Sequence, residues 1–494
     1  MWEIRQQGRW QGLPEADAAV IEQYLADIER RIRLSPKETA AIVEDMARLI
    51  RFYLAEGLTA QAATVRIGGD ILGDFYTEAA PEEWYPLDSA AKVYPLMLTH
   101  ASMSVFRVSA YLCRPVVPCV LQVALLSTVK RFPLFATTVR KGFFWHYIDA
   151  TRGRFTVKKE DNLPCVPIDV SGARALSFRL QYYERRISLE AFHILTDGTG
   201  ALTFLKTLVR EYLRLLGREI PYDTDVLSVS EAPDGAELQN DFPLADKADK
   251  EGFWARPAAQ IRGWRTGIQP ARVLHFLMSS GKLRAVSKAH GTTVTGFLAA
   301  ALFVAAAAAL RRPGPKRRLH IQIPVNMRQF YPSKSLRNFS MYSILQCTYD
   351  EITDLKAVIP IVKARLRAGT GKEAMDRMMN LTNALVAHPI LCFLPLMVKR
   401  PVFRRIVSFF DARALTATLS NLGMVRTDFG GEVDFFEMVL CANRIHGACC
   451  AMVGYGDKNV LSITKSTLED TLERKMYEIL VENGIDVDIE GVSL

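Results

Sequence analysis

The strongest candidate for a chemical role in this chain is a histidine that is followed, four residues later, by an aspartate and a glycine. His193 ends residues 187–193, where the residue types alternate as they do in a strand with one buried face. A short turn carries Asp197 and Gly198, and residues 202–216 then repeat apolar side chains at helical spacing. An imidazole at the end of a rigid strand is a candidate general base, and the turn supplies a carboxylate nearby. The alternative is a histidine that only hydrogen-bonds its neighbours.

The His-x-x-x-Asp-Gly pattern resembles that of the CoA-dependent acyltransferases with the chloramphenicol-acetyltransferase-like fold. This superfamily includes alcohol acetyltransferases, polyketide-associated acyltransferases and the condensation domains of peptide synthetases. Residues 192–213, FHILTDGTGALTFLKTLVREYL, look most like the bacterial alcohol-acetyltransferase branch. The resemblance implies that His193 removes the proton of an acceptor hydroxyl as that hydroxyl attacks an acyl thioester. It also implies that Asp197 and Gly198 belong to the site. Many relatives carry a second histidine where this chain has Phe192.

The same resemblance implies an α/β fold with two chloramphenicol-acetyltransferase-like lobes, whose mixed sheets surround a central tunnel. We expect a small N-terminal helical unit at residues 1–80, a first lobe at 84–218, an acidic linker at 219–268 and a second lobe at 269–494. The N-terminal unit is interpreted either as a docking or oligomerisation module or as a brace on the catalytic body. An acidic, proline-containing joint precedes the first lobe, so a chain that starts near Glu82 is predicted to fold.

The second lobe supplies further candidate residues. Residues 319–326 predict a strand that leads into Arg328, where the family has an arginine that pairs with the aspartate of the histidine motif. A buried Asp197 needs a cation or several donors, which favours this pair over an exposed loop arginine. The resemblance also implies substrate-binding roles for the following residues: Asn338, Ser340, Ser420 and Asn421.

The protonation of His193 leads to a further expectation about Asp197. A base must be neutral near pH 7, and a carboxylate in contact would hold the imidazole charged. We therefore expect Asp197 to face Arg328 rather than the imidazole. We expect a backbone carbonyl to accept from one ring nitrogen of His193, which leaves the other nitrogen free.

The composition is that of an ordinary globular protein and limits the partners. The net charge of +9 over 494 residues is compatible with CoA phosphates, an acyl carrier protein or a membrane surface, but is too diffuse to indicate nucleic acid. The 8 cysteines form no CxxC pair and have no histidine at metal-ligand spacing, so no metal site is predicted. Scattered cysteines and a charged start without an apolar stretch predict a cytoplasmic protein.

Two apolar segments raise the question of a membrane. Residues 293–310 are rich in alanine and are interpreted as a buried core helix. Residues 388–410 have two apolar halves around Lys399-Arg400-Pro401, and each half is too short to cross a bilayer. This second segment predicts either a pair of packed helices or a basic amphipathic stretch that touches a membrane surface.

Three functions are compatible with these features. The first is an O-acyltransferase that uses acyl-CoA as a co-substrate, acts on an alcohol and needs no permanently bound cofactor. The second is a condensation-type protein that takes acyl groups from a carrier protein. The third is a non-catalytic relative that binds a lipid or a protein partner.

Overall fold

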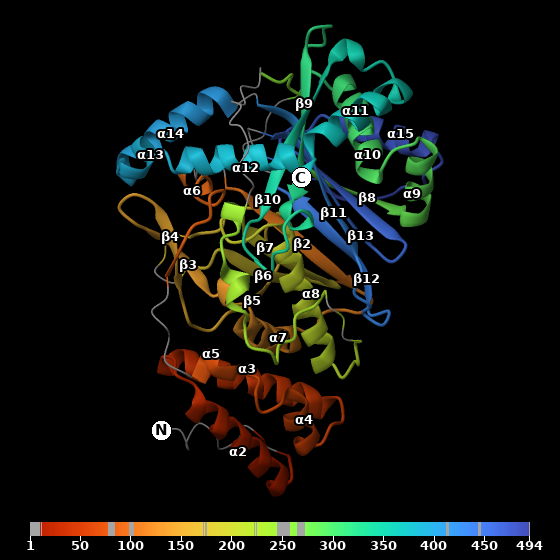
Figure 1. Ribbon diagram of the computed structural model, residues 1–494. Helices are drawn as coiled ribbons and strands as arrows, with labels where there is room; N and C mark the ends of the chain where they lie inside the picture. The colour runs from red at the N-terminus through yellow and green to blue at the C-terminus, as the bar shows by residue number, and fades with distance from the viewer. Residues whose placement is uncertain are drawn as a thin grey trace.

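The computed structural model shows two α/β lobes above a layer of N-terminal helices (Figure 1). It describes residues 10–493 except for the following positions: 11, 78–83, 98–102, 171, 173–174, 222, 224, 245–256, 264–271, 412–413 and 443–445. The first lobe is built on a five-stranded mixed sheet, and the second lobe on a seven-stranded mixed sheet. The predicted fold class, two lobes with mixed sheets and a small N-terminal helical unit, is confirmed.

In the described part of the N-terminal layer there are four helices. They are α2 (Glu15–Arg31), α3 (Pro36–Ala55), α4 (Ala60–Ile67) and α5 (Gly73–Thr77). Helix α3 begins at a cap in which Ser35 Oγ donates to the Glu38 carboxylate over 2.6 Å and accepts from the Glu38 N–H. The chain leaves this helix through Gly57, whose φ of 87° is a left-handed conformation that suits glycine.

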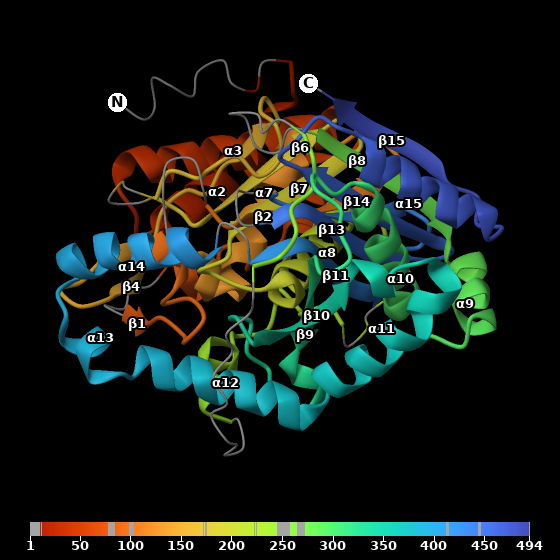
Figure 2. The same ribbon diagram turned by 90° about the horizontal axis from the view of Figure 1, so that it is seen from above.

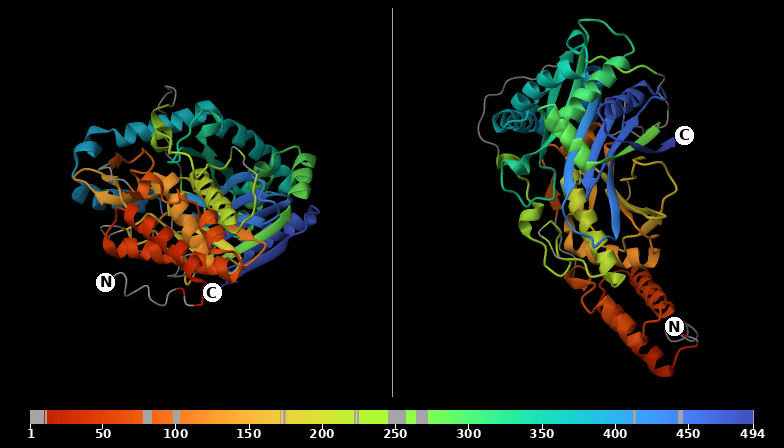
Figure 3. Two further views of the ribbon diagram at one scale, coloured as in Figure 1. Left: turned by 90° about the horizontal axis from the view of Figure 1, so that it is seen from below. Right: turned by 90° about the vertical axis from the view of Figure 1, so that its right-hand side faces the viewer.

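These helices pack on the first lobe, as the brace interpretation predicts. Their buried apolar residues belong to the same core cluster as those of the first lobe. The hydroxyl of Tyr53 donates to the carbonyl of Leu215 over 2.6 Å, and Arg154 reaches both oxygens of Asp45 at 2.6 and 2.7 Å. Figure 3 shows the helical layer against the lower end of the first lobe. A shared core means that the two parts stabilise one another.

The first lobe contains a main sheet, a smaller sheet and helices. The sheet has the order β12-β2-β7-β6-β5, and a three-stranded sheet has the order β1-β4-β3. The strands are β1 (Trp84–Pro86), β2 (Val105–Leu112), β3 (Thr137–Lys141), β4 (His146–Ala150), β5 (Val157–Lys159), β6 (Phe178–Tyr183) and β7 (Arg186–Phe192). The helices are α6 (Tyr94–Met97), α7 (Pro118–Arg131) and α8 (Gly198–Leu215), and α7 packs on both α3 and α8.

The second lobe has the strand order β10-β9-β11-β13-β14-β8-β15, in which β11 runs parallel to both of its neighbours. Its strands are β8 (Arg272–Ser279), β9 (Arg318–Asn326), β10 (Ser340–Thr348), β11 (Leu415–Val425), β13 (His446–Tyr455), β14 (Lys458–Lys465) and β15 (Asp488–Ser493). Its helices are α9 (Ser280–Ala289), α10 (Val294–Ala308), α11 (Leu355–Gly369), α12 (Lys372–Val386), α13 (Pro389–Phe393), α14 (Leu396–Asp411) and α15 (Thr471–Glu482).

One strand contradicts the predicted division of the chain at residue 269. Strand β12 (Val433–Leu440) comes from the second half but pairs with β2 at the edge of the first sheet. Across the two sheets, Nε2 of His275 on β8 lies 3.5 Å from a carboxylate oxygen of Glu437 on β12. The alternation of β12 predicts a strand but does not specify its partner, because pairing is decided by contacts far apart in the chain.

The apolar segments take two different positions. Helix α10 is buried in the core of the second lobe, which confirms its interpretation as a core helix. Among the described residues no single helix has the length and composition to cross a bilayer, although α9 and α10 together meet that test across a bend of 79°. Helices α12, α13 and α14 instead follow one another along the outer edge of the molecule (Figure 2).

Candidate active site

His193 lies in the turn that joins β7 to α8. Strand β7 is paired on both sides, with β2 and with β6, so the backbone that carries the imidazole is held firmly. The His193 N–H donates to the carbonyl of Ser104 over 2.8 Å. The ring of Tyr94 stacks on the imidazole with centroids 5.0 Å apart, and Phe106 packs against it at 5.1 Å. The side chain remains partly exposed, so the ring is both fixed and accessible.

A side-chain amide from the second lobe holds one ring nitrogen of His193. Oδ1 of Asn338 lies 2.9 Å from Nδ1 of His193, and Nδ2 of Asn338 lies 3.3 Å from Oδ2 of Asp88. An ionised carboxylate can only accept, so Asn338 turns its NH₂ to Asp88 and its carbonyl oxygen to the imidazole. Nδ1 of His193 therefore donates to Asn338, so in the neutral ring Nε2 is the acceptor. The sequence-based expectation of a backbone carbonyl at this place is wrong, because the chain before β10 brings Asn338 there instead.

Asp88 is the buried end of this hydrogen-bonded chain, and sequence reasoning missed it. Its side chain has no exposed surface, and Oδ1 accepts from the N–H of Ala91 over 2.7 Å. The nearest guanidinium nitrogen of Arg337 is 3.8 Å from Oδ2. Burial raises the pKa of Asp88, while Arg337 and the N–H groups of Ala91 and Asn338 act in the opposite direction. In the sequence, Asp88 is visible only as an aspartate that could accept from the backbone N–H of Ala91. Such aspartates are common in turns and do not indicate a function.

Asp197 faces away from the imidazole and towards the second lobe. Its Oδ2 accepts from Nη1 of Arg328 over 2.8 Å and from the N–H of Phe339 over 2.9 Å, and its Oδ1 accepts from the N–H of Gly200 at the start of α8. Arg328 follows β9 in a short 3₁₀ turn, and its guanidinium also donates to the carbonyl of Ser335. The predicted ion pair is present, and it ties the turn after His193 to the segment before β10.

Two glycines allow this turn to approach the second lobe closely. A Cβ at Gly198 would lie 2.7 Å from a terminal methyl of Leu422, the far end of a flexible side chain. A Cβ at Gly200 would lie 2.4 Å from the carbonyl oxygen of Leu336 and 2.2 Å from Oγ1 of Thr196. A backbone oxygen cannot move aside as a side-chain methyl can, so the turn requires glycine more strictly at position 200 than at position 198. The sequence shows this second glycine in Thr-Asp-Gly-Thr-Gly, but the pattern alone does not indicate its neighbour.

The remaining predicted residues lie on β10 and β11. Ser340 begins β10 and is partly exposed. Along β11, Ala417 and Leu419 pack in the second-lobe core, so alternation turns Ser420 to the opposite face. Asn421 donates from Nδ2 to Oγ1 of Thr295 over 3.0 Å and accepts at Oδ1 from the backbone two residues on, so both ends of its amide are bonded inside the second lobe. The structure thus joins Asn338 to His193, and substrate binding by all four residues stays a prediction.

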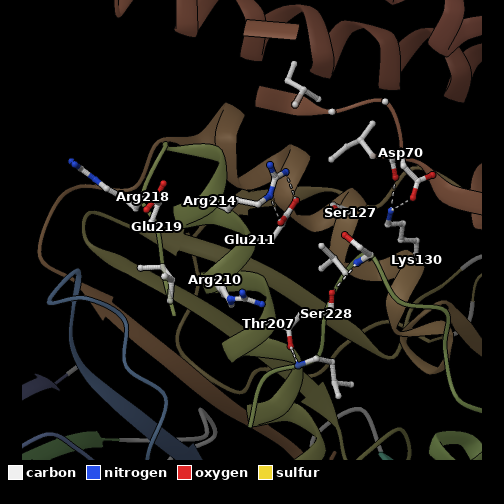
Figure 4. A pocket seen from close by; sticks show the side chains of 18 residues that line it. Asp70, Ser127, Lys130, Thr207, Arg210, Glu211, Arg214, Arg218, Glu219 and Ser228 are labelled. Atoms are coloured by element: carbon white, nitrogen blue, oxygen red, sulfur yellow. Dashed lines mark hydrogen bonds and ion pairs between the residues drawn. The ribbon is translucent and has the colours of Figure 1, made fainter. Parts of the chain in front are cut away.

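A separate cavity of about 560 Å³ lies between the N-terminal helices, α7, α8 and the loop after α8 (Figure 4). Lys130 on one wall pairs with Asp70, and Arg214 on another pairs with Glu211. None of the residues predicted for catalysis lines this cavity. It marks the seam between the brace and the first lobe, away from the chemistry of His193.

Comparisons with known proteins identify the fold. No protein-family model and no curated protein sequence matches the chain. The structure of polyketide synthase associated protein 5 from Mycobacterium tuberculosis is similar, with a TM-score of 0.54 and 14% identity over 81% of this chain and 98% of that chain. TRI101 from F. graminearum, solved with coenzyme A and deoxynivalenol, has a TM-score of 0.53 and 13% identity over 82% and 99%.

A third similar structure is the epimerization domain from the third module of tyrocidine synthetase B. It has a TM-score of 0.52 and 12% identity over 82% of this chain and 96% of that chain. Identities this low show a common fold rather than a common activity. The chain therefore shares with these three proteins a fold of two mixed α/β lobes, and in this chain His193 lies where the lobes meet.

Proposed function

We propose that this protein is an acyltransferase that moves an acyl group from an acyl-CoA thioester to an acceptor hydroxyl, with His193 as the general base. The observation that carries the proposal is the chain of contacts from His193 through Asn338 to Asp88, in which Nδ1 donates and Nε2 is the acceptor of a neutral, partly exposed ring. The similar fold of TRI101, which was solved with coenzyme A, supports the choice of donor.

The proposed reaction needs one proton acceptor at Nε2 of His193. The acceptor hydroxyl gives its proton to Nε2 while its oxygen attacks the thioester carbonyl carbon. The tetrahedral intermediate then collapses, the carbon–sulfur bond breaks, and the CoA thiolate recovers the proton from the imidazolium. Asn338 accepts from Nδ1–H throughout and so favours the charged ring that forms. General-base catalysis of this kind contributes about 10²–10⁴-fold.

Substrates would reach His193 through a tunnel between the two lobes, as the family resemblance implies. Ser340 and Ser420 are the candidates for contact with them. Ser420 is the better placed of the two to donate to the developing oxyanion, because β11 turns it away from the second-lobe core. We assign Asn421 a structural role instead, since its amide joins β11 to the start of α10.

A carrier-bound thioester is the second candidate donor. The similarity to an epimerization domain of a peptide synthetase favours this alternative. The chemistry at the carbonyl carbon is the same for both donors. The two donors differ in the group attached to the thioester sulfur, which is CoA in one case and a carrier protein in the other.

The test measures thiol release from acetyl-CoA, longer acyl-CoA thioesters and acyl carrier protein, each with a panel of alcohols. We expect CoA thioesters to react and His193→Ala to lower turnover by about 10²-fold or more with unchanged thermal unfolding. His290→Ala is a matched control, because Nε2 of His290 lies 2.8 Å from Oδ1 of Asn483 on the far side of the second lobe. Turnover of His193→Ala within a few-fold of wild type would exclude His193 as the base. Thiol release from no donor would favour a non-catalytic binding protein.

A further inference from the structure

Exposed apolar side chains gather on one part of the surface. Of the 16 large apolar residues that are exposed in the described part of the chain, half fall within two short segments. Phe393 and Met397 are 74% and 89% exposed, values that leave almost the whole side chain in water. The eight residues are Phe143, Phe144, Leu385, Ile390, Phe393, Met397, Val398 and Val402. A cluster of this kind commonly marks an interaction site.

The two segments form one continuous surface, which we call the hairpin–α14 surface. It consists of residues 143–144 at the tip of the β3–β4 hairpin and residues 385–402, from the end of α12 through α13 into α14. The carbonyl of Phe143 accepts from the N–H of Leu396 over 2.8 Å, and the rings of Phe144 and Phe393 lie 6.3 Å apart. Figures 1 and 2 both show the hairpin beside these helices.

A buried lysine fastens the hairpin to α14. Nζ of Lys399 donates to the carbonyl of Phe144 over 2.7 Å and lies 3.4 Å from the ring centroid of Trp145. Burial lowers the pKa of Lys399 to about 8. Since this contact holds Phe143 and Phe144 beside α14, the exposed rings are presented together rather than on a loose loop.

Basic residues dominate the charge of the segments that form the hairpin–α14 surface. Residues 137–147 and 387–410 contain six lysines and arginines and no aspartate or glutamate, in a chain whose net charge is +9. Lys141 and Arg405 are both exposed, and Arg140 pairs with Asp149 at 3.1 Å. A second copy of the same surface would bring like charges together. The negatively charged headgroups of a phospholipid bilayer complement both the cations and the apolar side chains.

The hairpin–α14 surface also lies next to the catalytic residues. Helix α14 packs on α6, whose first residue is Tyr94. The ring of Tyr94 is the one that stacks on the imidazole of His193. A bilayer that covered this surface would therefore lie on the side of the molecule from which α6 reaches the site.

We propose that the hairpin–α14 surface docks on an anionic phospholipid bilayer, with its apolar side chains at the boundary between headgroups and acyl chains and its cations at the headgroups. Docking does not depend on the proposed reaction, and the protein would lie on the bilayer without crossing it. The electrostatic part of this attraction falls as salt rises.

The experiment is co-sedimentation of the full chain with vesicles of phosphatidylcholine, either alone or mixed with phosphatidylglycerol. We expect binding to the mixed vesicles that weakens with added salt, and much weaker binding to phosphatidylcholine alone. The double variant Phe393→Ser, Met397→Ser is expected to lose about 10-fold or more in vesicle affinity, because two side chains no longer enter the bilayer. The charge variant Lys141→Glu, Arg405→Glu is expected to lose the preference for phosphatidylglycerol.

A matched control is the double variant Val65→Ser, Val481→Ser. These two valines are also exposed, at 67% and 44%, but lie on α4 and α15. This variant should bind vesicles as wild type does, and circular dichroism should show all three variants folded. Absence of wild-type binding at low salt, or equal binding by the Phe393→Ser, Met397→Ser variant, would overturn the proposal. A wild-type dimer that this variant converts to a monomer, without any vesicle binding, would assign the surface to self-association instead.

Discussion

Two buried carboxylates on either side of the segment 335–339 differ in what surrounds them. Asp197 lies 2.8 Å from a guanidinium nitrogen of Arg328 and accepts two backbone N–H groups. Asp88 has its nearest guanidinium nitrogen at 3.8 Å and gives one oxygen to the amide of Asn338. Direct pairing with a cation makes Asp197 a structural link between the lobes. Contact with an amide lets Asp88 act on the proton of His193.

The largest expected effect is on folding, through Asp197. Asp197→Asn should lower the free energy of unfolding by about 3 kcal/mol or more, because a mostly buried Arg328 loses its counter-charge. Urea denaturation measures this difference. Asp234→Asn is the matched control, since Asp234 lies equally close to Lys334, at 2.8 Å, but both side chains are exposed. The control should show no measurable change. Equal losses of unfolding free energy in the two variants would mean that burial of the Asp197–Arg328 pair adds nothing to stability.

The next effect is on turnover, through Asp88. In Asp88→Asn the new NH₂ group would meet that of Asn338, so Asn338 would turn its own NH₂ to the imidazole and move the ring proton to Nε2. We expect turnover to fall by about 10²-fold with KM nearly unchanged, as expected when a base is held in the wrong tautomer. Nitrogen chemical shifts of His193 should report the change of tautomer.

Asp376→Asn is the control for this substitution, because Asp376 is also buried but bonds Tyr331 and Lys372 instead. Its turnover should equal that of wild type. Normal turnover of Asp88→Asn, or a His193 tautomer that does not change, would show that Asp88 does not position the base.

The smallest expected effect is a pH dependence of stability and turnover through Asp88. Burial raises the pKa of Asp88 in the folded protein above its unfolded value of about 3.9. Between the unfolded and the folded pKa, the folded state therefore binds more protons than the unfolded state. The contribution of Asp88 to stability is fully present below the unfolded pKa and is lost as pH rises through the folded pKa. Turnover should change in the opposite sense, because protonated Asp88 no longer accepts from Asn338.

Urea denaturation and rate measurements over a pH series test this prediction. The stability of wild type relative to Asp88→Asn should increase as the pH is lowered through this window, while wild-type turnover falls. Parallel stability profiles for the two proteins would contradict a raised pKa at Asp88.

The N-terminal helices show how far local patterns determine packing. The cap at Ser35 and the end at Gly57 follow from hydrogen bonds and backbone conformations within a few residues, so the sequence predicts them. The same patterns predicted that a chain from Glu82 would fold alone. That chain would lose Tyr53 and Asp45, which bond Leu215 and Arg154 in the first lobe. Apolar faces on α3 and on α14 look alike in sequence, yet α3 is covered by the core, whereas Met397, Val398 and Val402 of α14 are exposed.

The sequence by itself determined the strand, turn and helix around His193, because these depend on short-range periodicity and on a carboxylate at a helix start. It also identified Arg328 as the partner of Asp197, through a family resemblance rather than through spacing. Only the tertiary structure decided that Asn338 holds the imidazole and that Asp88 lies behind it. These contacts join residues 145 and 250 positions apart, and no local pattern records which distant segments the packing of two lobes brings together.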